Sequence, residues 1–142
     1  MKLTNEQMTL LDQILVEGHA TKVIPILGGK AEITVDSMTA GSQLNVESYM
    51  KNIEGAPAFV VHTYSIKLLS EVLKRFHPMG KDPIIFKTPD EAEAFIKGRP
   101  SSMVDAIIAA QGAFEKELGD LSKAENLEEN FTQTPLPVQE PS

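Results

Sequence analysis

The sequence predicts an α+β fold, in which a single, mostly helical domain carries an N-terminal two-stranded β-hairpin and is followed by a disordered acidic C-terminal tail. Three observations lead to this prediction. Apolar residues recur at helical spacing over most of the chain, whereas residues 22–35 alternate with a period of two around a pair of glycines. After residue 122, acidic residues and prolines replace most of the apolar ones. We therefore expect a domain over residues 1–122 and a tail over residues 123–142.

The first element expected is a short amphipathic helix over residues 5–17. Thr4 and Gln7 have the spacing of a capping box, in which each side chain bonds the other residue's backbone N–H. Leu10, Leu11, Ile14 and Leu15 then follow at helical spacing, and Gly18 is a typical helix stop.

Residues 22–35 read as the β-hairpin, with Gly28-Gly29 as a two-residue turn. Ile33 and Val35 share one apolar face with Ala31, and polar residues alternate with them. Pro25 has no N–H to donate, so the first strand should lie at a sheet edge or be irregular at this residue. A lone hairpin is only marginally stable in water, so helices or another chain must cover it.

Two helices should follow, one from Thr39 to about Ile53 and one over residues 57–76. Pro57 suits the first position of the second helix, and His77-Pro78 would end it. Its apolar residues fill an arc of about 260° at 100° per residue, so we expect it to be the central helix, covered on most sides.

The last third of the domain should contain an extended run and two more helices. Ile84-Ile85-Phe86 is the extended run, and Thr88-Pro89 begins a helix that stops at Gly98. The final helix should begin at Ser101-Ser102, with Ser102 as a cap, and fray between residues 119 and 127. The tail beyond it has too little apolar surface to fold.

Charge and composition exclude several classes of function. The chain has 13 basic and 20 acidic residues, for a net charge of −7, and residues 115–142 hold seven of the acids and two of the bases. No basic field attracts nucleic acid. There is no secretory signal and no apolar run long enough to cross a membrane, so we expect a cytoplasmic protein. With no cysteine, disulfides and thiolate sites are excluded.

The sequence predicts no catalytic residue, no cofactor and no metal site. None of the three histidines forms a pair at helical spacing; His62 should be packed within the central helix and His77 should sit at its C-terminus. Gly28-Gly29-Lys30 lacks the spacing of a phosphate-binding loop. No serine lies in a nucleophile elbow. We therefore expect a protein that is not an enzyme.

The order of elements and three sequence segments carry a resemblance to a known family. The hairpin ends in Glu32-Ile33-Thr34-Val35, and Ser37-Met38-Thr39-Ala40-Gly41 leads into a helix. Residues 90–104 then form a short helix, a loop and the start of a long helix. Over residues 20–120 this pattern resembles the small tail assembly chaperones of tailed bacteriophages, and related baseplate or hub assembly proteins. The resemblance implies binding to an aggregation-prone tail component, typically the tape-measure protein, and no catalytic residue.

The predicted function is therefore protein binding without catalysis, with a tape-measure or other tail protein as the client. A structural subunit of the tail or baseplate, or a small cytoplasmic adaptor or regulatory module, remains the alternative, and a homo-oligomer is left open. Phe114 is the best single anchor, although packing in the core against the central helix is the favoured alternative for this residue. The expected contact surface combines the hairpin edge and the final helix: Val23, Ile24, Ile26, Leu27, Val104, Ile107, Ile108 and Phe114.

Overall fold

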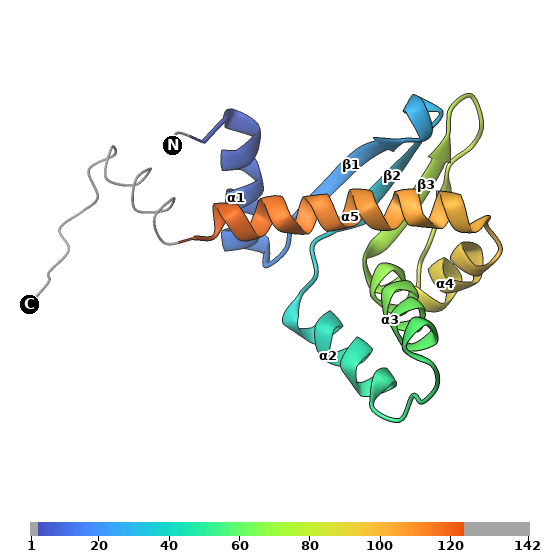
Figure 1. Ribbon diagram of the computed structural model, residues 1–142. Coiled ribbons are helices and arrows are strands. Elements are labelled where there is room, and N and C mark those ends of the chain that lie inside the picture. The colour runs from blue at the N-terminus through green and yellow to red at the C-terminus, as the bar shows by residue number, and fades with distance from the viewer. Residues whose placement is uncertain (1–2, 124–142) are drawn as a thin grey trace, which may run out of the picture.

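The structure is a computed structural model that describes residues 3–123, and the predicted tail lies outside these residues except for Lys123. The predicted α+β class is confirmed: the described residues form five α-helices and one antiparallel sheet (Figure 1). The helices are α1 (Asn5–Glu17), α2 (Ala40–Met50), α3 (Pro57–Val72), α4 (Pro89–Lys97) and α5 (Ser101–Leu121).

The predicted hairpin over residues 22–35 is confirmed as an antiparallel pair, but it belongs to a sheet of four strands and not two. Strands β1 (Thr21–Ile26), β2 (Ala31–Asp36), β3 (Leu73–Pro78) and β4 (Ile84–Ile85) follow one another in space in the order of the chain. β1 lies at one edge, as Pro25 predicted. The β1–β2 connection is a 3-10 turn over Leu27–Gly29 rather than a two-residue glycine turn, and Leu27 itself takes a positive φ of 54°.

The predicted helix over residues 57–76 is in fact a helix followed at once by a strand. Thr34 pairs with Arg75 but Val35 pairs with Leu73, so Lys74 is an extra residue in β3. This bulge lets Leu73 and Phe76, three positions apart, both face the core. Apolar residues three positions apart are also typical of a helix, which explains why the sequence predicted that the helix would continue to residue 76. His77 therefore lies in β3, with Nε2 2.9 Å from the carbonyl oxygen of Lys81, and does not cap a helix.

Three helix starts are confirmed by their caps. The hydroxyls of Thr4, Thr39 and Thr88 each accept the backbone N–H three residues further on. α1 also has the complete capping box with Gln7 and ends at Gly18, as predicted. At α5 the predicted cap was wrong, because Pro100 takes the N-cap position and no side chain bonds the first turn.

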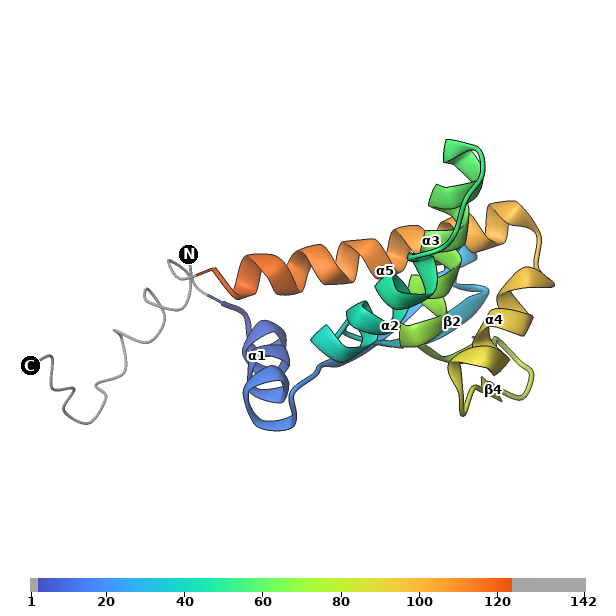
Figure 2. The ribbon, with the colours of Figure 1, turned by 90° about the horizontal axis from the view of Figure 1, so that it is seen from below.

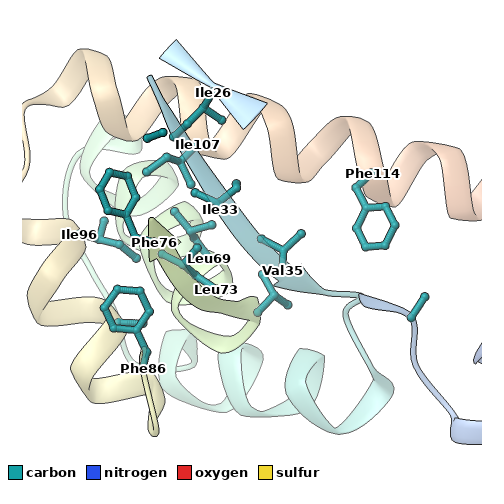
Figure 3. Close-up of a cluster of buried hydrophobic side chains, with 14 of the residues drawn as sticks. Ile26, Ile33, Val35, Leu69, Leu73, Phe76, Phe86, Ile96, Ile107 and Phe114 are labelled. Atoms are coloured by element: carbon teal, nitrogen blue, oxygen red, sulfur yellow. The ribbon is translucent and has the colours of Figure 1, made fainter. Parts of the chain in front are cut away.

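The core lies between one face of the sheet and the helices α3, α4 and α5. α5 crosses the strands, with α1 near its C-terminal end and α4 near its N-terminal end (Figures 1 and 2). Ile33 of β2, Leu69 of α3 and Ile107 of α5 belong to the same buried cluster (Figure 3). The other face of β2 carries Glu32, Thr34 and Asp36, which are half-buried. This alternation fixes which face α5 covers.

We predict that Leu69→Ala lowers the free energy of unfolding by about 2–5 kcal/mol, the usual cost of emptying a buried leucine site. Leu69 is 1% exposed. Leu44→Ala is the matched control, because Leu44 also lies in a helix but is 64% exposed. Urea unfolding of both variants measures the difference. A loss below about 0.5 kcal/mol for Leu69→Ala, the range of surface substitutions, would contradict this account of the core.

Candidate interaction surfaces

The residues predicted to form one contact surface are divided by the fold. Ile26, Ile107 and Phe114 are buried in the main core, and Phe114 is 2% exposed. Ile24 is half-buried against that core, whereas Val23 and Leu27 are exposed. A surface partner does not reach the buried members without opening the fold, so the hairpin and α5 do not present these side chains as one surface.

The edge of β1 is protected against the addition of another strand. The Ser37 N–H donates to the Ala20 carbonyl at 2.7 Å, so the antiparallel alternation turns the backbone groups of residues 21, 23 and 25 outward. The Thr21 N–H donates to Gln13 Oε1 at 3.1 Å, and Pro25 has no N–H. Among the described residues, Val23 is left as the one outward donor of this strand.

The edge of β4 is protected in the same way. The Phe86 N–H donates to the Lys74 carbonyl at 2.9 Å, which turns the backbone groups of residues 83, 85 and 87 outward. Pro83 has no N–H, and the Lys87 N–H donates to Glu91 Oε1 at 2.8 Å. Each edge thus combines one proline with one side-chain cap, a common protection against edge-to-edge pairing. Docking by strand addition is disfavoured at both.

Val104 and Ile108 of α5 do reach the surface. Both line a hollow of about 380 Å³ between α3, the end of α4 and the start of α5. Val61 and Ile66 of α3 form its other wall, and Val61 is 60% exposed. The polar groups around this hollow include Lys97, Arg99 and Asp105.

A second hollow, of about 340 Å³, lies on the other side of α3 against α2 and α4. Tyr49 of α2 and Phe59 of α3 line it, and Phe59 is 56% exposed. Both hollows share His62, Ile66 and Lys97, so they form one continuous region across α3. We call this region the α3 surface; its exposed or half-buried hydrophobic side chains are Tyr49, Phe59, Val61, Ile66, Val104 and Ile108.

The connection between α2 and α3 helps to hold Phe59 in place. Gly55 has a φ of 145°, and a Cβ built there would lie 3.0 Å from Cδ2 of Phe59. The ring therefore lies directly over a backbone that only glycine readily adopts. This connection lies away from the sheet at the periphery of the molecule (Figure 2).

The sequence contained the signal for the α3 surface, but the interpretation was wrong. Phe59 and Val61 belonged to the wide apolar arc of the predicted central helix, which was expected to be covered on most sides. Only the C-terminal half of α3 is buried, at Leu69 and Val72, because the sheet begins where the helix ends. His62, expected to be packed, is exposed.

An ion-pair network lies at the bottom of the second hollow. Glu93 of α4 accepts from Lys67 of α3 at 2.6 Å and from Lys97 at 2.7 Å. Burial alone would raise the pKa of Glu93, but the two lysines outweigh it and lower the pKa below its ordinary value. The Lys67 ammonium also lies 3.9 Å from the centre of the Tyr49 ring. These contacts link α2, α3 and α4.

Within residues 3–123, no group of three or more histidine, aspartate or glutamate side chains is placed to hold a metal ion. Over the same residues, no helix has both the length and the apolar character that crossing a bilayer requires. No protein family model, curated protein or solved structure matches the chain.

We predict that Glu93→Gln lowers the free energy of unfolding at pH 7 by on the order of 1 kcal/mol or less, the range of partly exposed ion pairs. Because the pKa of Glu93 is lower in the folded chain than in the unfolded chain, the ionised carboxylate stabilises the fold above its unfolded pKa. This stabilisation is lost as the pH falls through the folded pKa. The difference between wild type and Glu93→Gln should therefore shrink from pH 7 to pH 3.

Urea unfolding at pH 7, 5, 4 and 3 measures this difference. Glu54→Gln serves as the control, because Glu54 is exposed and lies in the loop between α2 and α3. If the difference in the free energy of unfolding between wild type and Glu93→Gln grows as the pH falls, the assigned ion-pair network is contradicted.

Proposed function

We propose that this chain is a non-enzymatic protein-binding factor that holds an apolar segment of a client on the α3 surface. One observation carries the proposal: two adjoining hollows on either side of α3 are lined by hydrophobic side chains that the described fold leaves uncovered. Exposed apolar surface that gathers in one place, rather than being scattered singly, is characteristic of binding sites.

The chemistry of the α3 surface suits a protein segment. Phe59 and Tyr49 are the large aromatic residues that dominate interface energies when a partner buries them. Val61, Val104 and Ile108 extend the apolar area on the other side of α3. Charged groups of both signs surround it, as in the polar rim of an ordinary protein interface.

The finer proposal is that the client is a tail protein of a bacteriophage. It rests on the resemblance to tail assembly chaperones, whose client is typically the tape-measure protein. The protected edges of the sheet support a carrier of this kind, because a protein that handles an aggregation-prone client must avoid pairing its own strands with the client. A structural subunit of the tail is the competing proposal, and it predicts that the chain stays in purified virions.

Co-expression with a tape-measure protein and other tail proteins of tailed bacteriophages tests the proposal. We predict that the wild-type chain keeps the tape-measure protein soluble and co-purifies with it. Phe59→Ala together with Val61→Ala should lower recovery at least about tenfold, since two anchors of this kind each contribute on the order of 1–2 kcal/mol. Because both side chains are more than half exposed, the melting temperature should change little.

Leu44→Ala is the matched control, because Leu44 is equally exposed on α2 but lines neither hollow. It should leave recovery unchanged. If the double variant recovers as much client as the wild type while remaining folded, the α3 surface is not the binding site. If no tail protein co-purifies with the wild type, the tail-client proposal fails.

A further inference from the structure

A third hollow, of about 280 Å³, lies near the C-terminal end of α5, whereas the α3 surface borders its N-terminal end. It lies where the end of α1, the β2–α2 linker and the last turns of α5 meet. Ile14, Met38 and Leu118 are its apolar lining residues, and Glu115 is its one carboxylate. It is independent of the proposed α3 surface and shares no lining residue with it.

The Glu115 carboxylate is held in one orientation by the fold. Its Oε2 accepts the Met38 N–H at 2.6 Å and the side-chain amide of Gln111 at 3.2 Å. Gln111 is itself buried, so the second donor is fixed within the core. Both donors bond the same oxygen, and Oε1 has no hydrogen-bond partner among residues 3–123.

The free oxygen is open to a ligand. Among the described residues, every side-chain oxygen or nitrogen that is sealed from solvent has a hydrogen-bond partner. Oε1 of Glu115 therefore remains accessible, and Glu115 lines the hollow. A fixed carboxylate with one free oxygen, set among apolar walls, is a preorganised acceptor for a positively charged group.

No cation of the described chain neutralises this carboxylate. Within residues 3–123, no lysine, arginine or histidine nitrogen lies within ion-pair distance of Glu115. Lys116 of α5 and Lys123, which follows the helix cap, both pair with Asp120, at 3.2 and 3.3 Å. Burial raises the pKa of Glu115, and the hydrogen bonds from Met38 and Gln111 offset only part of that rise.

Two helix C-termini add to the negative potential at the hollow. α1 ends at Gly18 and α5 is capped by Ser122, and both capping residues line the hollow. The C-terminal end of a helix carries partial negative charge and favours a nearby cation. Neither helix has a basic residue in its last turn. The carboxylate and both helix ends therefore all favour a positively charged ligand.

We propose that this hollow binds a lysine side chain of a protein partner, with its ammonium on Oε1 of Glu115 and its methylene stem against Ile14, Met38 and Leu118. Lysine suits the hollow better than arginine does. A guanidinium pairs best with both oxygens of a carboxylate, and here Oε2 already accepts two protein donors. An ammonium is a compact charge that a single oxygen can hold, and its unbranched stem suits an apolar wall.

The probe for the test is Nα-acetyl-lysine N-methylamide, added to the full-length ¹⁵N-labelled chain and followed by amide chemical shifts. We expect saturable shifts at Met38 and at the end of α5, with a Kd on the order of 1–10 mM, as befits a single small contact. The ¹³C-detected pKa of the Glu115 carboxyl should fall as the probe binds, because a nearby cation favours the ionised form.

Glu115→Gln keeps the size of the side chain and an oxygen that can accept the Met38 N–H, but it removes the charge. It should weaken binding at least about tenfold, and Glu115→Asp, which withdraws the carboxylate by one methylene, should weaken it as well. Glu17→Gln is the matched control, because Glu17 is an exposed carboxylate at the end of α1 that does not line the hollow. It should leave the affinity unchanged. The amide spectrum of each variant confirms its folding.

Three ligands complete the test. The norleucine analogue has the same stem without the ammonium and should not bind; equal binding would overturn the role of the charge. The arginine analogue should bind more weakly, and tighter binding would overturn the choice of lysine. Putrescine represents a free amine, and a clear preference for it over the lysine derivative would overturn a protein source. No saturable shift with any probe, or equal affinity in Glu115→Gln, would overturn the site itself.

Discussion

The structure depends on the burial of one face of a small sheet beneath a single long helix. β2 lies inside the sheet, and its alternating side chains place Ala31, Ile33 and Val35 on the covered face. α5 supplies Ile107 and Phe114 to the same buried cluster. Because apolar burial is the main driving force of folding, this contact sets the direction of α5 across the molecule.

The two ends of α5 then determine where binding surfaces arise. Its N-terminal end meets α3 and α4, where Val104 and Ile108 help to line the α3 surface. Its C-terminal end meets α1 and the β2–α2 linker, where Glu115 lines the third hollow. One helix thus joins two candidate sites that have no lining residue in common, and a partner long enough to follow α5 could contact both.

Two buried polar side chains, Ser37 of the connection between the sheet and α2 and Gln111 of α5, take part in the hydrogen bonds that hold this connection. The Ser37 hydroxyl accepts the Ala20 N–H at 2.9 Å, and Gln111 donates to the carboxylate that accepts the Met38 N–H. A buried polar group costs stability unless it is paired, so these bonds hold the linker in a defined path. The path of the linker fixes where α2 begins and so where Tyr49 meets α3. Each edge of the sheet is protected by a proline and by one side chain that accepts a backbone N–H, although β1 and β4 still expose Val23, Ile84 and Ile85.

The sequence by itself determined the elements whose signals are local. Caps at Thr4, Thr39 and Thr88 placed three helix starts, and Pro25 placed β1 at an edge, because these effects depend on a few neighbouring residues. Tertiary structure alone decided that residues 73–78 form a strand, since Leu73 and Phe76 have helical spacing and only the pairing with β2 introduces the bulge at Lys74. It also decided which apolar residues are covered. Phe59 and Phe114 both lie among the apolar residues of a predicted helix, but only Phe114 is buried in the core. The sequence placed Gln111 one helical turn before Glu115, but only the tertiary structure brought the Met38 N–H and the rest of the hollow to this carboxylate, because they come from segments far away in the chain.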